Sequence, residues 1–237
     1  MFQLKNTSQL IGAKLGNKAF VLLDLDDTLF AEKDYFKSVF ETFASKAGIQ
    51  IGLIADYMTS FSEVRSNVTD IFSHFLRMFG LYSEKNHQNL FDIYVNLEIS
   101  LTPYDGVDRF IDSLVGDGVG ISVLTNGVPQ AQKNKWLSLK IGEKSVINFY
   151  AARDLYCDKP NEITYELWRS HQKVEWSNVI AIGDKYENDV RYPFSMGAQA
   201  IHIDHSEHQR SIHGLRFKIA SDFSSAAEIA KLLIGQI

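Results

Sequence analysis

VLLDLDDTLF (residues 21–30) places three aspartates directly behind an apolar run. A run such as Val-Leu-Leu predicts a strand that is buried within a sheet. An ionised side chain at the end of such a strand is costly unless it is paired, hydrogen-bonded or bound to a metal. Asp24, Asp26 and Asp27 therefore need partners, and the rest of the sequence must supply them.

Composition limits the classes of protein that this chain can represent. With 237 residues, of which 45% are hydrophobic, it is long enough for one large domain or for a core with an insertion. The net charge of -5 provides no basic field, so we expect no nucleic acid polymer and no anionic membrane as a partner. The beginning lacks the apolar core of a signal peptide, no run of about 18 apolar residues occurs, and Cys157 is the only cysteine. We therefore expect a cytoplasmic protein without an internal disulfide.

Short apolar runs alternate with helical patterns from residue 104 onward. This alternation is the signature of βα units, and it predicts an α/β core with a Rossmann-like parallel sheet. Helical spacing of apolar residues predicts helices between the runs, at 108–118, 128–139, 161–172 and 187–197. The predicted strands are 21–26, 120–125, 146–152, 178–184 and 199–204.

Residues 34–103 differ, because their apolar positions keep helical spacing throughout. They predict an inserted, all-helical cap domain of about four helices, so the core domain would comprise residues 1–33 and 104–237. The aromatic side chains of this segment repeat at i, i+3, i+4 and i+7, which favours a packing core over a stacking pocket. They are Phe36, Phe40, Phe43, Phe72, Phe75 and Phe79.

Polar residues end several of the predicted strands, and ligands of open α/β sheets bind at the carboxyl ends of strands. Asp24 and Asp26 are two positions apart, so they point to the same side and repel each other unless a cation or a shared proton intervenes. The other residues expected at this edge are Thr125, Asn126, Lys159, Asp184 and Asp189.

Carboxylates, a hydroxyl, an amide and an ammonium suit phosphoryl transfer with Mg²⁺. Mg²⁺ prefers carboxylate, phosphate and water oxygens. One aspartate can act as a covalent nucleophile, and a second can protonate the leaving oxygen and then activate water. A lysine and a hydroxyl can stabilise the charge on the phosphoryl oxygens.

Four segments resemble, in order, the four motifs of the haloacid dehalogenase superfamily. They are DLDDTL (24–29), VLTNG (123–127), DKP (158–160) and GDKYENDV (183–190). The helical insertion behind the first motif resembles the α-helical cap of the subfamily that contains small-molecule phosphatases, phosphomutases and dehalogenases. The resemblance covers essentially the whole chain and implies the same core fold with a cap.

The resemblance also implies roles for residues that match the motifs. Asp24 would be the nucleophile and a metal ligand, and Asp26 would be the general acid and base and would bind the metal through its backbone carbonyl. Asp184 would complete the Mg²⁺ site. Lys159 would hold the nucleophile and the phosphate together.

Four further positions are implied as binding or supporting residues. Thr125 would bind the phosphoryl group, and Asn126 would donate to it from its backbone or its amide. Thr28 would support the loop behind the first strand. Asp189 would be the second acid of the last motif, acting through water or through Lys159.

Asp26 favours phosphate chemistry, because the dehalogenases of this superfamily lack a carboxylate at that position. We therefore expect a Mg²⁺-dependent phosphatase that hydrolyses a phosphomonoester of a small soluble metabolite through an aspartyl-phosphate. The alternatives are a nucleoside monophosphate 5'-nucleotidase, a phosphomutase, or a non-catalytic ligand-binding protein on the same scaffold. The sequence indicates neither the substrate nor the oligomeric state.

Three histidines and two other residues have less specific patterns. His202, His205 and His208 follow one another at every third position, a spacing that does not direct three imidazoles to one ion. Cys157 lies near the presumed site but has no histidine close in sequence, so we do not expect a nucleophilic cysteine. Asp27 is expected only to cap the end of the strand.

Overall fold

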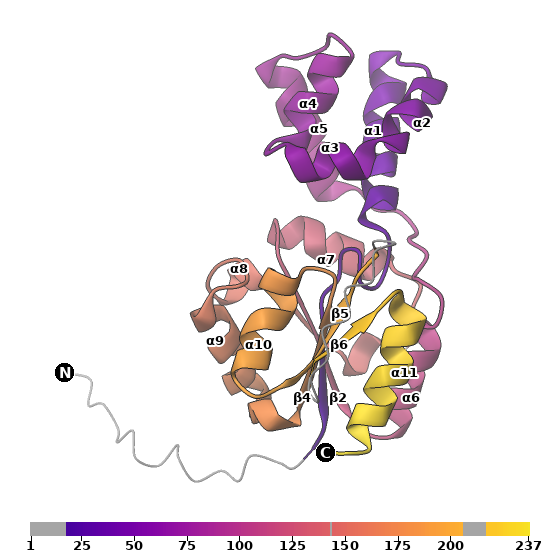
Figure 1. The fold of residues 1–237 in the computed structure, drawn as a ribbon. Helices are drawn as coiled ribbons and strands as arrows, with labels where there is room; N and C mark the ends of the chain where they lie inside the picture. The colour runs from indigo at the N-terminus through magenta and orange to yellow at the C-terminus, as the bar shows by residue number, and fades with distance from the viewer. Residues whose placement is uncertain (1–17, 143, 206–216) are drawn as a thin grey trace, which may run out of the picture.

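A computed structural model describes residues 18–142, 144–205 and 217–237 and shows a helical bundle above an α/β part (Figure 1). Over these described residues, the sheet of the α/β part has six strands, all parallel, in the order β3-β2-β1-β4-β5-β6. The strands are β1 (Phe20–Leu23), β2 (Gly120–Thr125), β3 (Asn148–Ala151), β4 (Val179–Gly183), β5 (Gln199–Ile203) and β6 (Phe217–Ala220).

Strand β1 is central and is buried on both faces. Val21 and Leu23 pack into the main apolar cluster, whereas Phe20 and Leu22 pack into a second cluster on the other face. This alternation follows from the two-residue period of a strand. Figure 1 shows α6 (Val107–Gly116) and α11 (Phe223–Ile234) on one side of the sheet. Helices cover the other side as well, so the central strand is enclosed.

The helices of the second side lie between the strands in sequence. Figure 1 places α8 (Ala152–Leu155), α9 (Glu162–Gln172) and α10 (Arg191–Ser195) there. A single π-helical turn, Tyr186–Val190, precedes α10. Helix α7 (Pro129–Ser138) lies at the end of the sheet that faces the bundle (Figure 1).

The bundle consists of helices alone, as the sequence predicts, but it contains five rather than about four. Its aromatic side chains pack together: the rings of Phe40 and Phe75 stack with centroids 4.2 Å apart, and both are fully buried. The packing interpretation of these residues is therefore confirmed. The helices are α1 (Glu32–Ala47), α2 (Ile51–Thr59), α3 (Phe61–Asn67), α4 (Ile71–Met78) and α5 (Glu84–Asn96).

The predicted parallel α/β core with a helical insertion is thus the observed fold, with small shifts at the strand ends. The first strand ends at Leu23 rather than at residue 26, and β3 begins at Asn148 because a 3₁₀ turn, Lys144–Val146, precedes it. Strand β6 and helix α11 were not predicted. Within the described part of the chain, none of the helices combines the length and apolar character needed to cross a membrane.

The register of the sheet determines where the site lies. Leu23 pairs with Val123 on one side and with Ile182 on the other. The three strands therefore end at one edge of the sheet, and the chain leaves them beneath the bundle (Figure 1).

Candidate active site

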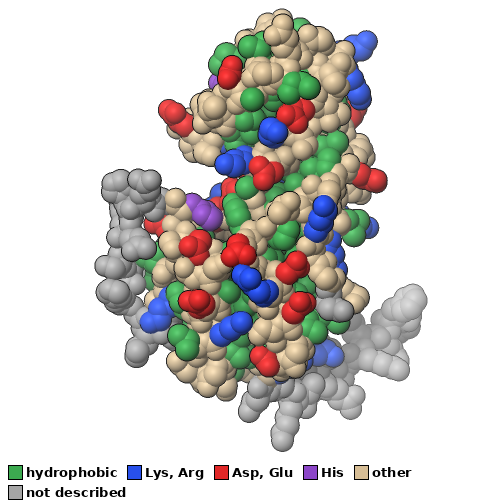
Figure 2. Space-filling view, turned by 90° about the vertical axis from the view of Figure 1, so that its right-hand side faces the viewer, with side chains coloured by type: hydrophobic (Ala, Val, Ile, Leu, Met, Phe, Trp, Pro, Cys, Tyr) green, Lys and Arg blue, Asp and Glu red, His purple; other side chains and the backbone are tan. Residues whose placement is uncertain are grey.

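A cleft of about 240 Å³ lies at the carboxyl edge of the sheet, and residues from all four motifs line it. From the side, Figure 2 shows a hollow between the bundle and the α/β part, with acidic and basic side chains near it. The lining combines core residues with residues of the bundle. They are Asp24, Asp26, Glu32, Arg65, Tyr94, Thr125, Asn126, Gly127, Arg153, Asp158, Lys159, Lys185, Asn188 and Asp189.

Lys159 joins two of the predicted acidic residues. Its Nζ lies 2.7 Å from Oδ1 of Asp24 and 2.7 Å from Oδ1 of Asp189, and all three residues are buried. Burial opposes the charged ammonium, but Asp189 and Asp24 outweigh it and hold the pKa of Lys159 above its usual range. The predicted contact between the lysine and Asp24 is therefore present.

Asp24, Asp184 and Asp189 form a carboxylate cluster. One oxygen of each lies within 4.8 Å of one oxygen of the others. Burial, and then the charge of Asp189, raise the pKa of Asp24 to about 7 despite the opposing effect of Lys159. Burial and the charge of Asp24 raise the pKa of Asp184 to about 8. Oδ1 of Asp184 is buried and accepts no hydrogen bond from any described residue.

This cluster has the chemistry of a divalent-cation site. An unpaired buried carboxylate oxygen is costly, and a hard cation among three carboxylates relieves both the desolvation and the mutual repulsion. The residues therefore fit a metal such as Mg²⁺. Asp189 lies within the cluster and also contacts Lys159, one of the two routes through which it was expected to act from the sequence.

The side chain of Asp26 lies outside this cluster. Both of its oxygens accept hydrogen bonds from Nζ of Lys135, each at 2.9 Å, and Oδ2 also accepts one at 2.8 Å from Nε2 of Gln132. Asp24 and Asp26 thus do not share one cation through their carboxylates, because each has a lysine of its own. Metal binding by the backbone carbonyl of Asp26 stays a prediction.

The hydroxyl of Thr125 borders the cleft as predicted, and Gln132 donates to it at 2.7 Å. The amide of Asn126 has a different place from the one expected. Its Nδ2 donates to the backbone oxygen of Lys159, and its Oδ1 accepts from the backbone nitrogen of that residue. The amide therefore fixes the lysine segment, and a donor from Asn126 to a phosphate stays a prediction. Thr28 is fully buried, and its hydroxyl has no hydrogen-bond partner among the described residues.

Three charged residues near Asp26 were not identified from the sequence. Lys135 contacts Asp26 directly, Glu32 lies near Lys135, and Arg65 contacts Glu32. Lys135 lies on α7, Glu32 in the first turn of α1 and Arg65 on α3. Arg65 reaches Glu32 with its Nε 3.4 Å from Oε2, and both line the cleft. A weak signal for Lys135 existed, since the buried face of its helix carries Gln132 and Lys135 where apolar residues are usual.

The histidines contact separate loops of the site. Nε2 of His202 donates to the carbonyl of Asp184 at 2.8 Å, and Nε2 of His205 donates to the carbonyl of Asp27 at 2.7 Å. His208 lies outside the described residues. The two described histidines therefore support backbone segments and do not converge on one point.

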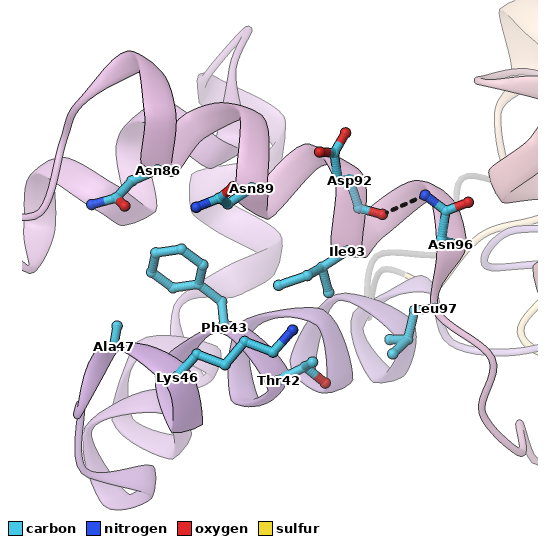
Figure 3. Close-up of a pocket in the computed structure, with 10 residues that line it drawn as sticks. All are labelled: Thr42, Phe43, Lys46, Ala47, Asn86, Asn89, Asp92, Ile93, Asn96 and Leu97. Atoms are coloured by element: carbon cyan, nitrogen blue, oxygen red, sulfur yellow. Dashed lines mark hydrogen bonds between the residues drawn. The ribbon is translucent and has the colours of Figure 1, made fainter.

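A larger hollow of about 660 Å³ lies elsewhere, between α1 and α5 of the bundle. Figure 3 shows Phe43, Ile93 and Leu97 between these two helices, with Lys46 and Asp92 as the only charged residues among those drawn. It contains no motif residue and no cluster of reactive groups. The motif residues therefore line the smaller cleft, which is the candidate active site.

Comparisons with known proteins agree with this fold. The family described as haloacid dehalogenase-like hydrolase matches residues 19–192. No curated protein sequence matches the chain.

Three solved structures illustrate the likeness. The HAD-hydrolase YfnB from Bacillus subtilis, bound to magnesium, has a TM-score of 0.63 at 15% identity and covers 90% of this chain and 98% of its own. A 2-haloacid dehalogenase from Pseudomonas syringae pv. Tomato DC3000 has a TM-score of 0.55 at 18% identity, covering 91% and 99%. A HAD phosphatase from Thermococcus onnurineus has a TM-score of 0.50 at 18% identity, covering 91% and 97%.

At such low identity these structures show a shared fold and not a shared substrate. The family match is stronger evidence, because it spans most of the chain and includes all four motif segments. The protein therefore belongs to the haloacid dehalogenase-like hydrolases.

Proposed function

We propose that this protein is a Mg²⁺-dependent phosphatase that hydrolyses a phosphomonoester of a small metabolite. The observation that carries the proposal is the carboxylate cluster of Asp24, Asp184 and Asp189, in which one oxygen of each lies within 4.8 Å of the others, together with a buried Oδ1 of Asp184 that accepts no hydrogen bond from any described residue. Such an oxygen calls for a cation, and Mg²⁺ is commonly bound by one or two carboxylates together with a substrate phosphate. The cleft of about 240 Å³ suits a small leaving group.

Asp24 and Asp184 would hold the metal, together with the backbone carbonyl of Asp26. When bound, Mg²⁺ supplies positive charge against the oxygens of the transferring phosphoryl group. Lys159 adds a second positive charge from the protein side, since its ammonium is fixed by Asp24 and Asp189. Thr125 supplies a hydroxyl at the border of the cleft.

Asp24 is the nucleophile in this proposal. Lys159 binds Oδ1, which leaves Oδ2 of Asp24 to attack phosphorus. As the new bond to phosphorus forms, the bond to the leaving oxygen breaks, and the proton of the Asp26 carboxyl passes to that oxygen. The products of this step are a free alcohol and an aspartyl-phosphate.

Asp26 then serves as the base of the second step. Its carboxylate accepts a proton from a water molecule that attacks the phosphorus of the aspartyl-phosphate. The bond between phosphorus and Asp24 breaks, which releases phosphate and restores both carboxyl groups to their initial states. One residue can perform both steps because the proton it loses in the first is regained in the second.

Asp26 also distinguishes this proposal from dehalogenation. Displacing a halide requires no proton on the leaving group, so a dehalogenase has no need for an acid beside its nucleophile. Here Asp26 lines the cleft and is held there by Lys135 and Gln132. Its presence and its fixed place support phosphate chemistry.

The test is phosphate release from sugar phosphates, nucleoside monophosphates and phosphorylated acids, each with Mg²⁺ and with EDTA. Release of chloride from 2-chloropropionate serves as the comparison reaction. We expect Mg²⁺-dependent phosphate release, no chloride release, and complete loss of turnover in Asp24→Asn. Chloride release without phosphate release, or an active Asp24→Asn protein, would contradict the proposal.

A further inference from the structure

Lys135 is a buried cation that the proposed mechanism does not use. Its side chain is 1% exposed, and its Nζ lies 2.9 Å from each oxygen of Asp26. Moving an ammonium out of water costs several kcal/mol. A lysine whose only role was to make the surface of α7 polar would therefore point toward the solvent. Lys133, two residues earlier on the same helix, is exposed.

The geometry determines which oxygen of Asp26 remains available. Each carboxylate oxygen offers two lone pairs. Oδ2 uses both, because it accepts from Lys135 at 2.9 Å and from Gln132 at 2.8 Å. Among the described residues, Oδ1 accepts from Lys135 alone and keeps one lone pair. Oδ1 is therefore the oxygen that can exchange a proton with a substrate or with water.

The bundle fixes Lys135 from the other side. Its Nζ faces the rings of Tyr35 and Tyr94, with distances of 5.2 and 5.6 Å to their centroids, and Oε1 of Glu32 lies 3.9 Å away. Attraction to aromatic faces and to a second carboxylate restricts an ammonium that could otherwise rotate freely. The preceding residue fastens the same helix to the bundle, because Nδ2 of Asn134 donates to the backbone carbonyl of Val95 on α5 at 2.8 Å.

We propose that Lys135 is a positioning residue that orients Asp26 so that its Oδ1 faces the leaving oxygen. This inference rests on the proposed phosphatase function. Lys135 itself touches neither substrate nor metal in this scheme and acts only through Asp26. Removing it should therefore reproduce the kinetic defect of Asp26→Asn rather than create a defect of its own.

Two substrates of similar size separate this role from a general loss of structure. p-Nitrophenolate leaves phosphorus without a proton, whereas the alkoxide from benzyl phosphate requires one. General acid catalysis contributes about 10²- to 10⁴-fold, so Lys135→Met should lower kcat/KM for benzyl phosphate by about 10²-fold or more. For p-nitrophenyl phosphate the loss should be under about tenfold, since no acid is needed.

The matched controls are Lys133→Met and a double variant. Lys133→Met removes the same charge from an exposed position of the same helix and should leave both values of kcat/KM unchanged. Asp26→Asn should show the same contrast between the two substrates as Lys135→Met. Adding Lys135→Met to Asp26→Asn should change neither value further, because the residue it acts through is already gone.

Other results would overturn the inference. Equal losses on both substrates, or losses that multiply in the double variant, mean that Lys135 does not act through Asp26. If Lys135→Met does not fold, Gln132→Met is the alternative variant, because it removes the other hydrogen bond to Asp26. It must lower kcat/KM more for benzyl phosphate than for p-nitrophenyl phosphate, by a smaller ratio than expected for Lys135→Met, or the inference fails. A wild-type protein that releases phosphate neither from these two substrates nor from the metabolite panel refutes the proposed function itself. Turnover without the contrast between the two substrates refutes only the role of Lys135.

Discussion

Replacing the nucleophile Asp24 by asparagine should stabilise the metal-free protein, and the gain should increase with pH. Burial raises the pKa of Asp24 from its ordinary value of 3.8 to about 7. The folded state therefore binds this proton more tightly than the unfolded state, so folding becomes less favourable as pH rises between these two values. Asparagine is neutral at every pH and does not carry this cost.

The size of the effect follows from the shift in pKa. One unit corresponds to about 1.4 kcal/mol, so the rise from 3.8 to about 7 costs about 4 kcal/mol at any pH above 7. At pH 5.5 only about 2 kcal/mol of this cost is present. The advantage of Asp24→Asn should thus grow by about 2 kcal/mol between pH 5.5 and pH 8. Lys159 retains Asp189 at 2.7 Å in the variant, so it is not left without an acidic partner.

Urea unfolding in EDTA, followed by tryptophan fluorescence at both pH values, measures the effect. Asp56→Asn, which changes an exposed aspartate of α2, is the control and should shift the free energy of unfolding by little at either pH. Adding Mg²⁺ should stabilise the wild type and leave Asp24→Asn nearly unchanged, because ligand binding stabilises only the form that binds. An advantage of the variant that is constant or falls with pH would refute the reasoning.

Three further substitutions test other parts of the structure. Gly183→Ala would place a Cβ 2.3 Å from that of Asp189, so we expect a loss of about 1–3 kcal/mol in urea unfolding and weaker Mg²⁺ binding by calorimetry. Phe40→Ala removes a buried ring that stacks 4.2 Å from Phe75, and it should cost about 3–5 kcal/mol in the same unfolding assay. Asn126→Ala leaves a backbone donor and acceptor of the DKP segment unpaired, which should cost about 1–3 kcal/mol and reduce kcat in the phosphate-release assay.

The edge of the sheet where the site lies could be predicted from sequence because of a property of parallel sheets. All strands of such a sheet end on the same side, so the residues at or just beyond the ends of β1, β2 and β4 had to meet. Asp24, Thr125 and Asp184 satisfy this rule. Lys159 lies beyond a short helix after β3, and only its place in a motif indicated that its side chain turns back to the edge.

The sequence around Lys135 carries only a weak signal of burial and nothing that identifies Asp26 as its partner. A lysine within a polar helix is normally solvated, and the contact with Asp26 joins residues more than one hundred positions apart. The predicted number of helices in the bundle was wrong for a different reason. Helices α2 and α3 meet at Ser60 without the glycine or proline that marks most helix ends, so the aromatic periodicity runs through the break. Periodicity indicates which face is buried but not where one helix stops.

The two catalytic carboxylates proposed here lie two residues apart and yet have separate surroundings. Asp24 is bound to Lys159, which comes from the segment after β3, and Asp26 is bound to Lys135, which comes from α7. If one cation served both, moving a proton at Asp26 would also change the charge balance at the nucleophile. With a lysine for each, the acid can lose and regain its proton while Asp24 keeps its ammonium partner. Burying these lysines with their acidic partners is costly, and short charged hydrogen bonds offset the cost: Lys159 lies 2.7 Å from both Asp24 and Asp189, and Lys135 lies 2.9 Å from each oxygen of Asp26.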